Sequence, residues 1–212
     1  MSRLTILTGQ SGSGKTSYLL ERLSAANAAG PAPGASDASD AADVASMAGA
    51  AGSTPGTPDA ANAAGTAIPS LATAVGLISP GRFEGGAKTG IEALLLPSHE
   101  RFLLAEPTER VTPPTSPTQG LAWAFNPQSV EKVNAHLRSL ATLAHGPYAG
   151  RTLVIDEIGP LEFHHGQGFK AALELLDQAA YANALVVIRP SLLAQAQARW
   201  QTTYTQIELF EH

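Results

Sequence analysis

The sequence predicts a three-layer α/β domain, in which helices cover both faces of a mostly parallel central sheet that a β-hairpin extends. Two compact apolar runs, residues 153–155 and 185–188, are typical of strands buried on both faces of a parallel sheet. A helical pattern separates them, and such a strand–helix–strand unit requires a right-handed crossover between parallel strands. A further strand, Arg3–Thr8, is followed by a glycine-rich turn and then by another helical pattern, which begins near Lys15.

The other elements follow from periodicity and from turn residues. Asn126 is placed to cap a helix that begins at Pro127, along which apolar residues recur at three- and four-residue spacing. The Pro- and Thr-rich segment 106–120 is expected to be a loop. Further strands are expected at 74–79, 90–96, 101–105 and 204–210, with a turn at 97–100, and further helices at 169–180 and 192–200.

The length of 212 residues suits one domain with an insertion. Residues 25–70 hold 18 alanines, 6 glycines and 5 prolines, but no aromatic residue and no Lys or Arg. Glycine and proline interrupt every window in which alanine could build several helical turns, and few large apolar side chains are present to offset chain entropy. We therefore expect a single domain over 1–212 with a low-complexity, disordered insertion at 25–70.

The charge balance argues against a polyanion-binding surface. The chain carries 13 Lys and Arg against 18 Asp and Glu, a formal net charge of −5, and the cations form no cluster. Cysteine is absent, which excludes disulfides, thiolate zinc sites and cysteine nucleophiles. No apolar run is long enough for a signal peptide or a membrane span. We expect a cytoplasmic protein that binds neither nucleic acid nor membrane.

Residues 9–16 fit the pattern G-x-x-x-x-G-K-[ST] at every fixed position and lie between a predicted strand and a predicted helix. The glycines let backbone N–H groups wrap around phosphate oxygens, and the helix presents its positive N-terminal end to the same anion. Lys15 supplies a charge for the β- and γ-phosphates, and Thr16 a hydroxyl for Mg²⁺. The predicted nucleotide-binding residues are Gly9, Gln10, Ser11, Gly12, Ser13, Gly14, Lys15, Thr16 and Ser17.

Two acids, Asp156 and Glu157, follow the apolar run 153–155. The carboxyl end of a buried strand faces the crevice where open α/β sheets bind ligands. Asp156 is therefore predicted to hold the metal as the Walker B acid, directly or through water, and Glu157 to polarise an attacking water. Strands often end in solvated acids, so this reading depends on the phosphate loop upstream.

Arginines are expected at this site because the transferring phosphoryl group carries charge that must be neutralised. Arg82 and Arg189 both follow predicted strands, so both are candidate catalytic residues on the ligand side of the sheet. The alternative for either is an ion pair with a surface acid. Glu162 is expected to hold Arg82 or Lys88, or to cap its own loop.

For two pairs of ring-bearing residues, a structural role is favoured over a functional one. His164 and His165 are adjacent in sequence, cannot easily converge on one metal ion, and are expected in a solvated loop. Trp123 and Phe125 could stack on a nucleobase, but an aromatic anchor for the neighbouring helix is the favoured role.

The stretch 152–163, Thr-Leu-Val-Ile-Asp-Glu-Ile-Gly-Pro-Leu-Glu-Phe, together with the phosphate loop, resembles the small P-loop nucleoside-triphosphatase family that includes thermophile and cancer-related NTPases. Its most specific part is 156–162, and further similarity lies in 75–78, 81–82, 85–91, 123–125 and Asn134. The resemblance covers nearly the whole chain except 25–70 and about 107–119. It implies a P-loop NTPase fold that slowly hydrolyses several nucleoside triphosphates to diphosphates with Mg²⁺ and with little base selectivity.

The leading hypothesis is therefore a Mg²⁺-dependent nucleoside-triphosphatase, whose partners are ATP, GTP and other triphosphates. A small-molecule kinase on the same fold is the first alternative, although no arginine-dense lid segment is present to exclude water. A nucleotide-dependent switch that binds a protein partner is the second alternative.

Overall fold

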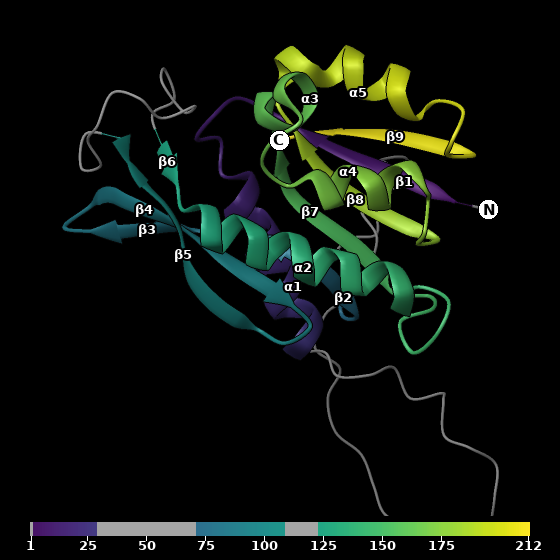
Figure 1. Cartoon of the computed structure of the whole chain (residues 1–212), viewed down its shortest axis with the longest axis horizontal. Coiled ribbons are helices and arrows are strands. Elements are labelled where there is room, and N and C mark those ends of the chain that lie inside the picture. The colour runs from purple at the N-terminus through teal and green to yellow at the C-terminus, as the bar shows by residue number, and fades with distance from the viewer. Residues whose placement is uncertain (1, 29–70, 109–122) are drawn as a thin grey trace, which may run out of the picture.

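Nine strands form one mixed sheet in the computed structural model, which describes residues 2–28, 71–108 and 123–212. The order is β6-β5-β4-β2-β7-β8-β1-β9, with β3 paired to β4 (Figure 1). The neighbours β2, β7, β8, β1 and β9 run parallel, and the remaining pairs are antiparallel. The strands are β1 (Arg3–Thr8), β2 (Ala74–Ile78), β3 (Gly81–Glu84), β4 (Ala87–Leu96), β5 (Glu100–Pro107), β6 (Trp123–Phe125), β7 (Thr152–Ile158), β8 (Asn183–Ile188) and β9 (Gln206–Glu211).

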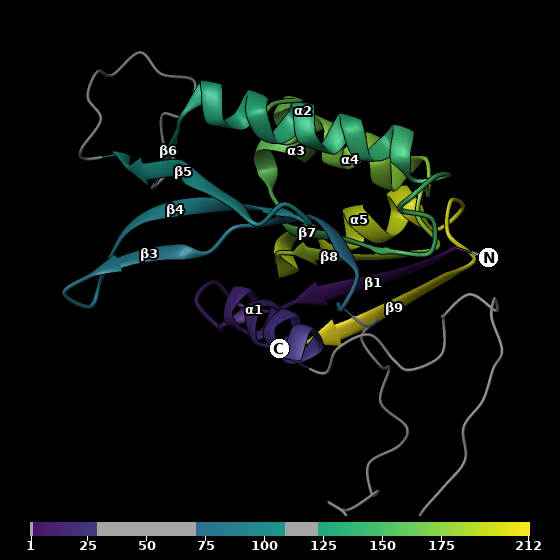
Figure 2. The same cartoon turned by 90° about the horizontal axis from the view of Figure 1, so that it is seen from below.

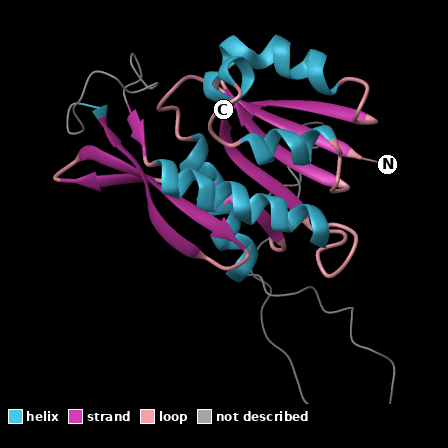
Figure 3. Ribbon diagram, viewed as in Figure 1, coloured by secondary structure: helices cyan, strands magenta, loops and turns pink. Residues whose placement is uncertain are grey.

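Helices cover both faces of this sheet, so the molecule has the three layers that the sequence predicts (Figure 3). On one face α1 packs Leu19 and Leu23 into a core with the buried side chains of β7 and β8. On the other face α2, α4 and α5 share a larger core with the same strands, and Figure 2 shows α1 and α2 on opposite sides. The helices are α1 (Lys15–Ala28), α2 (Pro127–Leu143), α3 (Pro160–His165), α4 (Lys170–Asp177) and α5 (Leu193–Trp200), with a 3₁₀ turn, η2 (Pro190–Leu192).

The apolar runs of the sequence become the centre of the sheet. β7 and β8 pair in parallel from Thr152, opposite Asn183, onwards, and β1 lies on the far side of β8. Parallel strands that are covered on both faces need apolar side chains pointing both ways, which explains the absence of alternation in these runs. The carboxyl ends of β1, β7 and β8 meet at one edge, and the predicted site residues other than Arg82 lie there.

A glycine permits the parallel strands β2 and β7 to pair. Gly76 has a φ of 125°, and a Cβ at this position would lie 2.1 Å from the backbone oxygen of Val154. Only a residue without a side chain fits such a close approach. On its other edge β2 pairs with β4, so Gly76 lies where the parallel strands join the antiparallel ones.

The structure differs from the sequence prediction in several short segments. β4 begins at Ala87 rather than at residue 90, and β5 continues to Pro107, so the first two residues of the predicted loop 106–120 belong to a strand. β3 and β6 extend the antiparallel part, and α3 replaces a predicted loop. All three are too short, at 3 to 6 residues, to produce a recognisable period. Helix α1 continues to Ala28, three residues past the predicted start of the insertion. The rest of that insertion, 29–70, and residues 109–120 of the predicted loop lie outside the described residues.

The predicted cap of α2 is confirmed. The Asn126 side-chain oxygen accepts hydrogen bonds from the N–H groups of Gln128 (2.9 Å) and Ser129 (3.2 Å), and Pro127 occupies the first turn. Across the described ranges, no helix is both long and apolar enough to cross a membrane.

Candidate functional site

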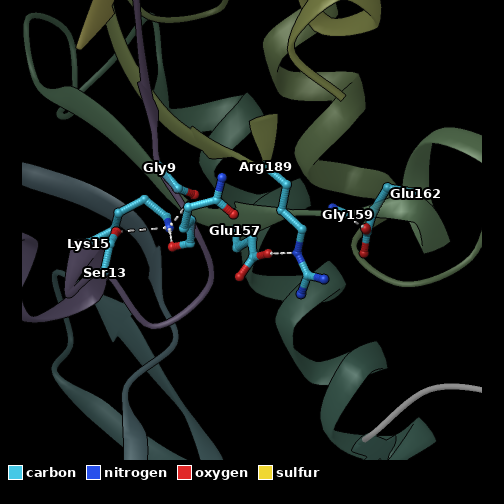
Figure 4. Close-up of polar contacts among 8 residues, drawn as sticks. Gly9, Ser13, Lys15, Glu157, Gly159, Glu162 and Arg189 are labelled. Atoms are coloured by element: carbon cyan, nitrogen blue, oxygen red, sulfur yellow. Dashed lines mark hydrogen bonds and ion pairs between the residues drawn. The ribbon is translucent and has the colours of Figure 1, made fainter. Parts of the chain in front are cut away.

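The loop between β1 and α1 has the backbone that its glycines predict. Gly9, Gly12 and Gly14 have φ values of 154°, 81° and 94°, which side-chain-bearing residues rarely adopt. Lys15 is 8% exposed, and its ammonium donates hydrogen bonds to the carbonyls of Gly9 (2.8 Å) and Gln10 (2.7 Å) (Figure 4). The lysine charge therefore lies within the curve of the loop.

A β-bulge sets the two acids of β7. Ile155 pairs with Val186, but Ile158 pairs with Ile188, so Asp156 and Glu157 together face a single residue of β8. Consecutive strand residues normally point to opposite faces of a sheet, and bulges re-aim them. Both acids consequently line the same cavity.

Asp156 is almost completely buried, at 2% exposure. Its Oδ2 accepts a hydrogen bond from the Ser79 N–H (3.1 Å), and the Ser79 hydroxyl donates to the Asp156 backbone oxygen (2.7 Å). Burial raises the pKa of Asp156 to about 6, against the opposing effect of hydrogen bonds from Ser79 and Thr16. Keeping a buried carboxylate ionised costs free energy unless a cation binds to it.

The donor set at this point fits a nucleotide-bound Mg²⁺. Thr16 and Asp156 are oxygen donors that already contact each other. Within the described ranges, no three His, Cys, Asp or Glu side chains gather as a metal site. Mg²⁺ usually keeps several waters and takes one or two carboxylates plus substrate phosphates, so two protein oxygens suffice for it. The same pair would be too sparse for a structural ion.

Glu157 and Arg189 form an ion pair between the ends of β7 and β8 (Figure 4). The side chains are 37% and 49% exposed, and both line the cavity. Ion pairs this exposed contribute about 0–1 kcal/mol, so little free energy is needed to separate them. Arg189 follows the carboxyl end of β8 and lines the cavity, so it lies at the edge of the sheet where the sequence predicts it.

Glu162 has a capping role. Its carboxylate accepts hydrogen bonds from the N–H groups of Gly159 (2.8 Å) and Phe169 (2.9 Å), and burial raises its pKa. It thus closes the turn that follows the two acids and begins α3. Of the two roles expected from the sequence, the structure shows the cap and not the pairing with Arg82 or Lys88, because both carboxylate oxygens accept hydrogen bonds from backbone donors.

The cavity has a volume of about 320 Å³ and joins the phosphate loop to the antiparallel strands. Ser11 and Thr16 line it from the loop, and Lys88 and Ile91 line it from β4. Aromatic and apolar walls come from β5, β6 and the residue before α4: Leu104, Trp123, Phe125 and Phe169. Phe125 and Phe169 pack edge to face, with centroids 6.4 Å apart.

Several predicted residues lie elsewhere or act differently. Arg82 is the second residue of β3 and pairs with Glu84 (2.7 Å), so the structure does not bring it to the cavity. Its strand turns away with the hairpin, a geometry that strand-end position in sequence does not reveal. His164 and His165 are solvent-exposed as expected, but on α3 rather than in a loop. Trp123 is a wall of the cavity rather than only an anchor for α2.

The place of Lys88 in the cavity, beside Trp123, is what sequence reasoning missed. The Lys88 Nζ lies 4.8 Å from the centre of the Trp123 ring, a cation–π contact that spans β4 and β6. Nothing in the local sequence marks it, because only strand pairing across β4, β5 and β6 brings the two side chains together.

A phosphate loop after β1, an acidic pair at the end of β7, and a strand between β1 and β7 define a P-loop NTPase fold. A scan against family models and a search of curated proteins find no match.

Two solved structures share this fold. The crystal structure of THEP1 from the hyperthermophile Aquifex aeolicus has a TM-score of 0.57 at 15% identity, covering 98% of this chain and 88% of that one. The solution structure of a human cancer-related nucleoside triphosphatase has a TM-score of 0.53 at 20% identity, covering 99% and 88%. The chain therefore has the fold of small P-loop NTPases.

Proposed function

We propose that this protein is a Mg²⁺-dependent nucleoside-triphosphatase that releases phosphate from ATP, GTP and other triphosphates. The observation that carries the proposal is that Thr16, Asp156 and Glu157 line one cavity at the mouth of a phosphate loop whose curve already holds the Lys15 ammonium. Binding, charge neutralisation and activation of a nucleophile each have a residue there. The name of the human structural neighbour, a nucleoside triphosphatase, supports the same activity.

Each side chain has a defined task in hydrolysis. Lys15 and the loop N–H groups bind the β- and γ-phosphates. Thr16 and Asp156 would hold Mg²⁺, which neutralises phosphate charge when bound. Glu157 orients a water for attack in line with the γ-phosphorus and accepts its proton. Arg189 is the candidate for neutralising charge that develops on the phosphoryl oxygens, because it lines the cavity and Arg82 does not.

We propose broad base specificity, because the predicted nucleotide contacts, residues 9–17, are made to phosphates, which every nucleoside triphosphate shares. Selection between bases would need hydrogen bonds to their edges. We also propose a cytoplasmic location. The negative net charge of the chain supports an enzyme that acts on free nucleotides rather than on nucleic acid.

The test is phosphate release from ATP, GTP, CTP and UTP, with and without Mg²⁺. Wild-type protein should release phosphate from all four, only with the metal. Lys15→Ala should lose both nucleotide-induced thermal stabilisation and turnover, since the loop then lacks its cation. Lys170→Ala is the matched control, because Lys170 is an exposed lysine outside the cavity. Normal binding and turnover in Lys15→Ala would refute the proposal.

A further inference from the structure

The cavity is larger than hydrolysis requires, because the attacking group in hydrolysis is a single water. Thr16 and Asp156 would hold the Mg²⁺ that accompanies the β- and γ-phosphates, so they would mark the γ end of a bound triphosphate. The base would lie at the other end of the phosphate chain. Ile91, Trp123 and Phe125 line the same cavity as Thr16 and Asp156, on its β4 and β6 side. A group seated among them can approach the γ-phosphorus from the side opposite its leaving oxygen.

The size and walls of this space suit a small organic molecule. The volume of about 320 Å³ falls within the range of small-molecule sites, roughly 300–1,000 Å³. One water occupies only about 30 Å³ of liquid. The walls include the rings of Trp123, Phe125 and Phe169, which orienting a water does not require. Apolar and aromatic surfaces with a few polar groups are typical of ligand pockets.

Lys88 gives this space its electrostatic preference. It is solvent-exposed, and among the described residues no carboxylate forms an ion pair with it. The Lys88 ammonium lies 4.8 Å from the centre of the Trp123 ring, so a planar group in contact with these two residues would lie beside a cation. Arg189 lines the same cavity, but its charge is paired with Glu157. Lys88, beside an aromatic ring, therefore favours a ligand that combines a planar ring with a negative charge.

We propose that this cavity is the acceptor site of a phosphotransferase, and that its ligand is a single-ring, hydroxyl-bearing anion of the pyrimidine nucleoside monophosphate type. The inference rests on the proposed function, because the same triphosphate is the donor. An acceptor oxygen forms a bond to the γ-phosphorus while the bond to the β,γ-bridging oxygen breaks. The nucleoside diphosphate leaves with that electron pair, and the acceptor hydroxyl proton passes to the Glu157 carboxylate.

Binding is tested by calorimetric titration of UMP into protein saturated with Mg²⁺ and a non-hydrolysable ATP analogue, so that the phosphate loop is filled. UMP should bind, and Trp123→Leu and Lys88→Gln should each weaken it about fivefold to tenfold, the size of one stacking or charge contact. Lys132→Gln is the matched control, because Lys132 lies 4.5 Å over the Phe102 ring outside the cavity. It should leave UMP affinity unchanged.

Two fragments of UMP separate the contributions. Uridine keeps the ring, so Trp123→Leu should weaken it and Lys88→Gln should not. Glycerol 3-phosphate keeps a hydroxyl and an anion but no ring, so Lys88→Gln should weaken its binding and Trp123→Leu should not. Equal affinity for UMP and glycerol 3-phosphate, or UMP binding unaffected by both variants, would overturn the proposal. Thermal melting of each variant without ligand verifies that it is folded.

The reaction is tested with γ-labelled ATP, separating labelled phosphate from labelled UMP product. Label on UMP that grows with UMP concentration supports the acceptor site. Release of phosphate to water alone, with no UMP binding, would overturn this inference while leaving the proposed hydrolysis intact. Absence of both products and of ATP binding would refute the proposed function itself, so the two failures are distinguishable.

Discussion

The two halves of the sheet hold their functional groups in opposite ways. On the parallel side Lys15 and Asp156 are 8% and 2% exposed, and each hydrogen-bonds to the backbone. On the antiparallel side Lys88 is exposed and rests on an aromatic ring, and Arg82 pairs with a neighbour on its own strand. In the parallel half, loop and strand geometry positions the buried charged groups. In the antiparallel half, exposed side chains form the surface.

This difference has a consequence for specificity. A phosphate group is the same in every nucleotide, so a rigid site made of backbone donors and buried charges can recognise it. The second half presents side chains that can be exchanged without changing the strands. Substitutions in the parallel half should therefore strongly reduce stability or phosphate release, whereas those in the antiparallel half should change which ligands bind.

The largest effect is expected where the halves meet. Gly76→Ala places a Cβ 2.1 Å from the Val154 backbone oxygen, at a φ of 125°. The overlap must be relieved by moving β2 away from β7, at a cost of about 3 kcal/mol or more in the free energy of unfolding. Gly85→Ala is the control, because its φ is 57° but nothing lies within 4 Å. Urea denaturation should show a much smaller loss for Gly85→Ala, about 1 kcal/mol.

Removing the buried charge should separate stability from activity. Burial raises the pKa of Asp156 from 3.8 to about 6, so the folded protein at pH 7 bears the cost of an ionised carboxylate. Asp156→Asn should therefore stabilise the protein by about 1–3 kcal/mol at pH 7. Metal-dependent phosphate release should fall by about 100-fold. A variant that is both less stable and fully active would contradict the role of Asp156.

The two arginines compare the halves directly. Arg189→Gln should lower phosphate release by roughly tenfold or more, because it removes a positive charge from the cavity. Arg82→Gln should change it less than about twofold, since that side chain forms an exposed ion pair with Glu84. Equal losses in steady-state turnover would mean that the antiparallel hairpin reaches the phosphates.

The smallest effect concerns His136, at the seam between α2 and β4. Its Nε2 lies 3.1 Å from the Leu96 carbonyl oxygen, and burial lowers its pKa below the usual 6.5. Below pH 6.5 the unfolded histidine therefore binds more protons than the folded one, so its contribution to stability is full above that pH and declines as pH falls toward the folded pKa. Asp156, whose pKa is raised, contributes in the opposite direction between pH 7 and 5. The free energy of unfolding of the wild type minus that of His136→Gln, measured by urea denaturation, should therefore become smaller as pH falls from 7 to 5.

The sequence predicts the parallel half well because its signals are local. The phosphate loop is a continuous motif, and the runs 153–155 of β7 and 185–188 of β8 are apolar without interruption because both faces of the sheet are covered. The bulge at Asp156 and Glu157 was not foreseen, although the prediction that both acids act together depends on it. Register against a neighbouring strand decides a bulge, and one strand's sequence does not contain that information.

The antiparallel half is less predictable for the same reason. β3 and β6 are short and irregular in pattern, and pairing with β4 and β5 stabilises them. The contact between Lys88 and Trp123 joins residues that are 35 positions apart in the chain. Arg82 and Arg189 both follow predicted strands in sequence, yet only Arg189 lies at the carboxyl edge of the parallel strands.

The measurement that tests the central claim most directly is phosphate release by Glu157→Gln beside its nucleotide-induced thermal shift. Gln keeps the shape of the side chain but cannot accept a proton from the nucleophile. The account predicts that the shift with ATP and Mg²⁺ is retained while turnover falls about tenfold or more. Undiminished turnover would show that the acid beside the Walker B carboxylate takes no part in the reaction, and would contradict the account.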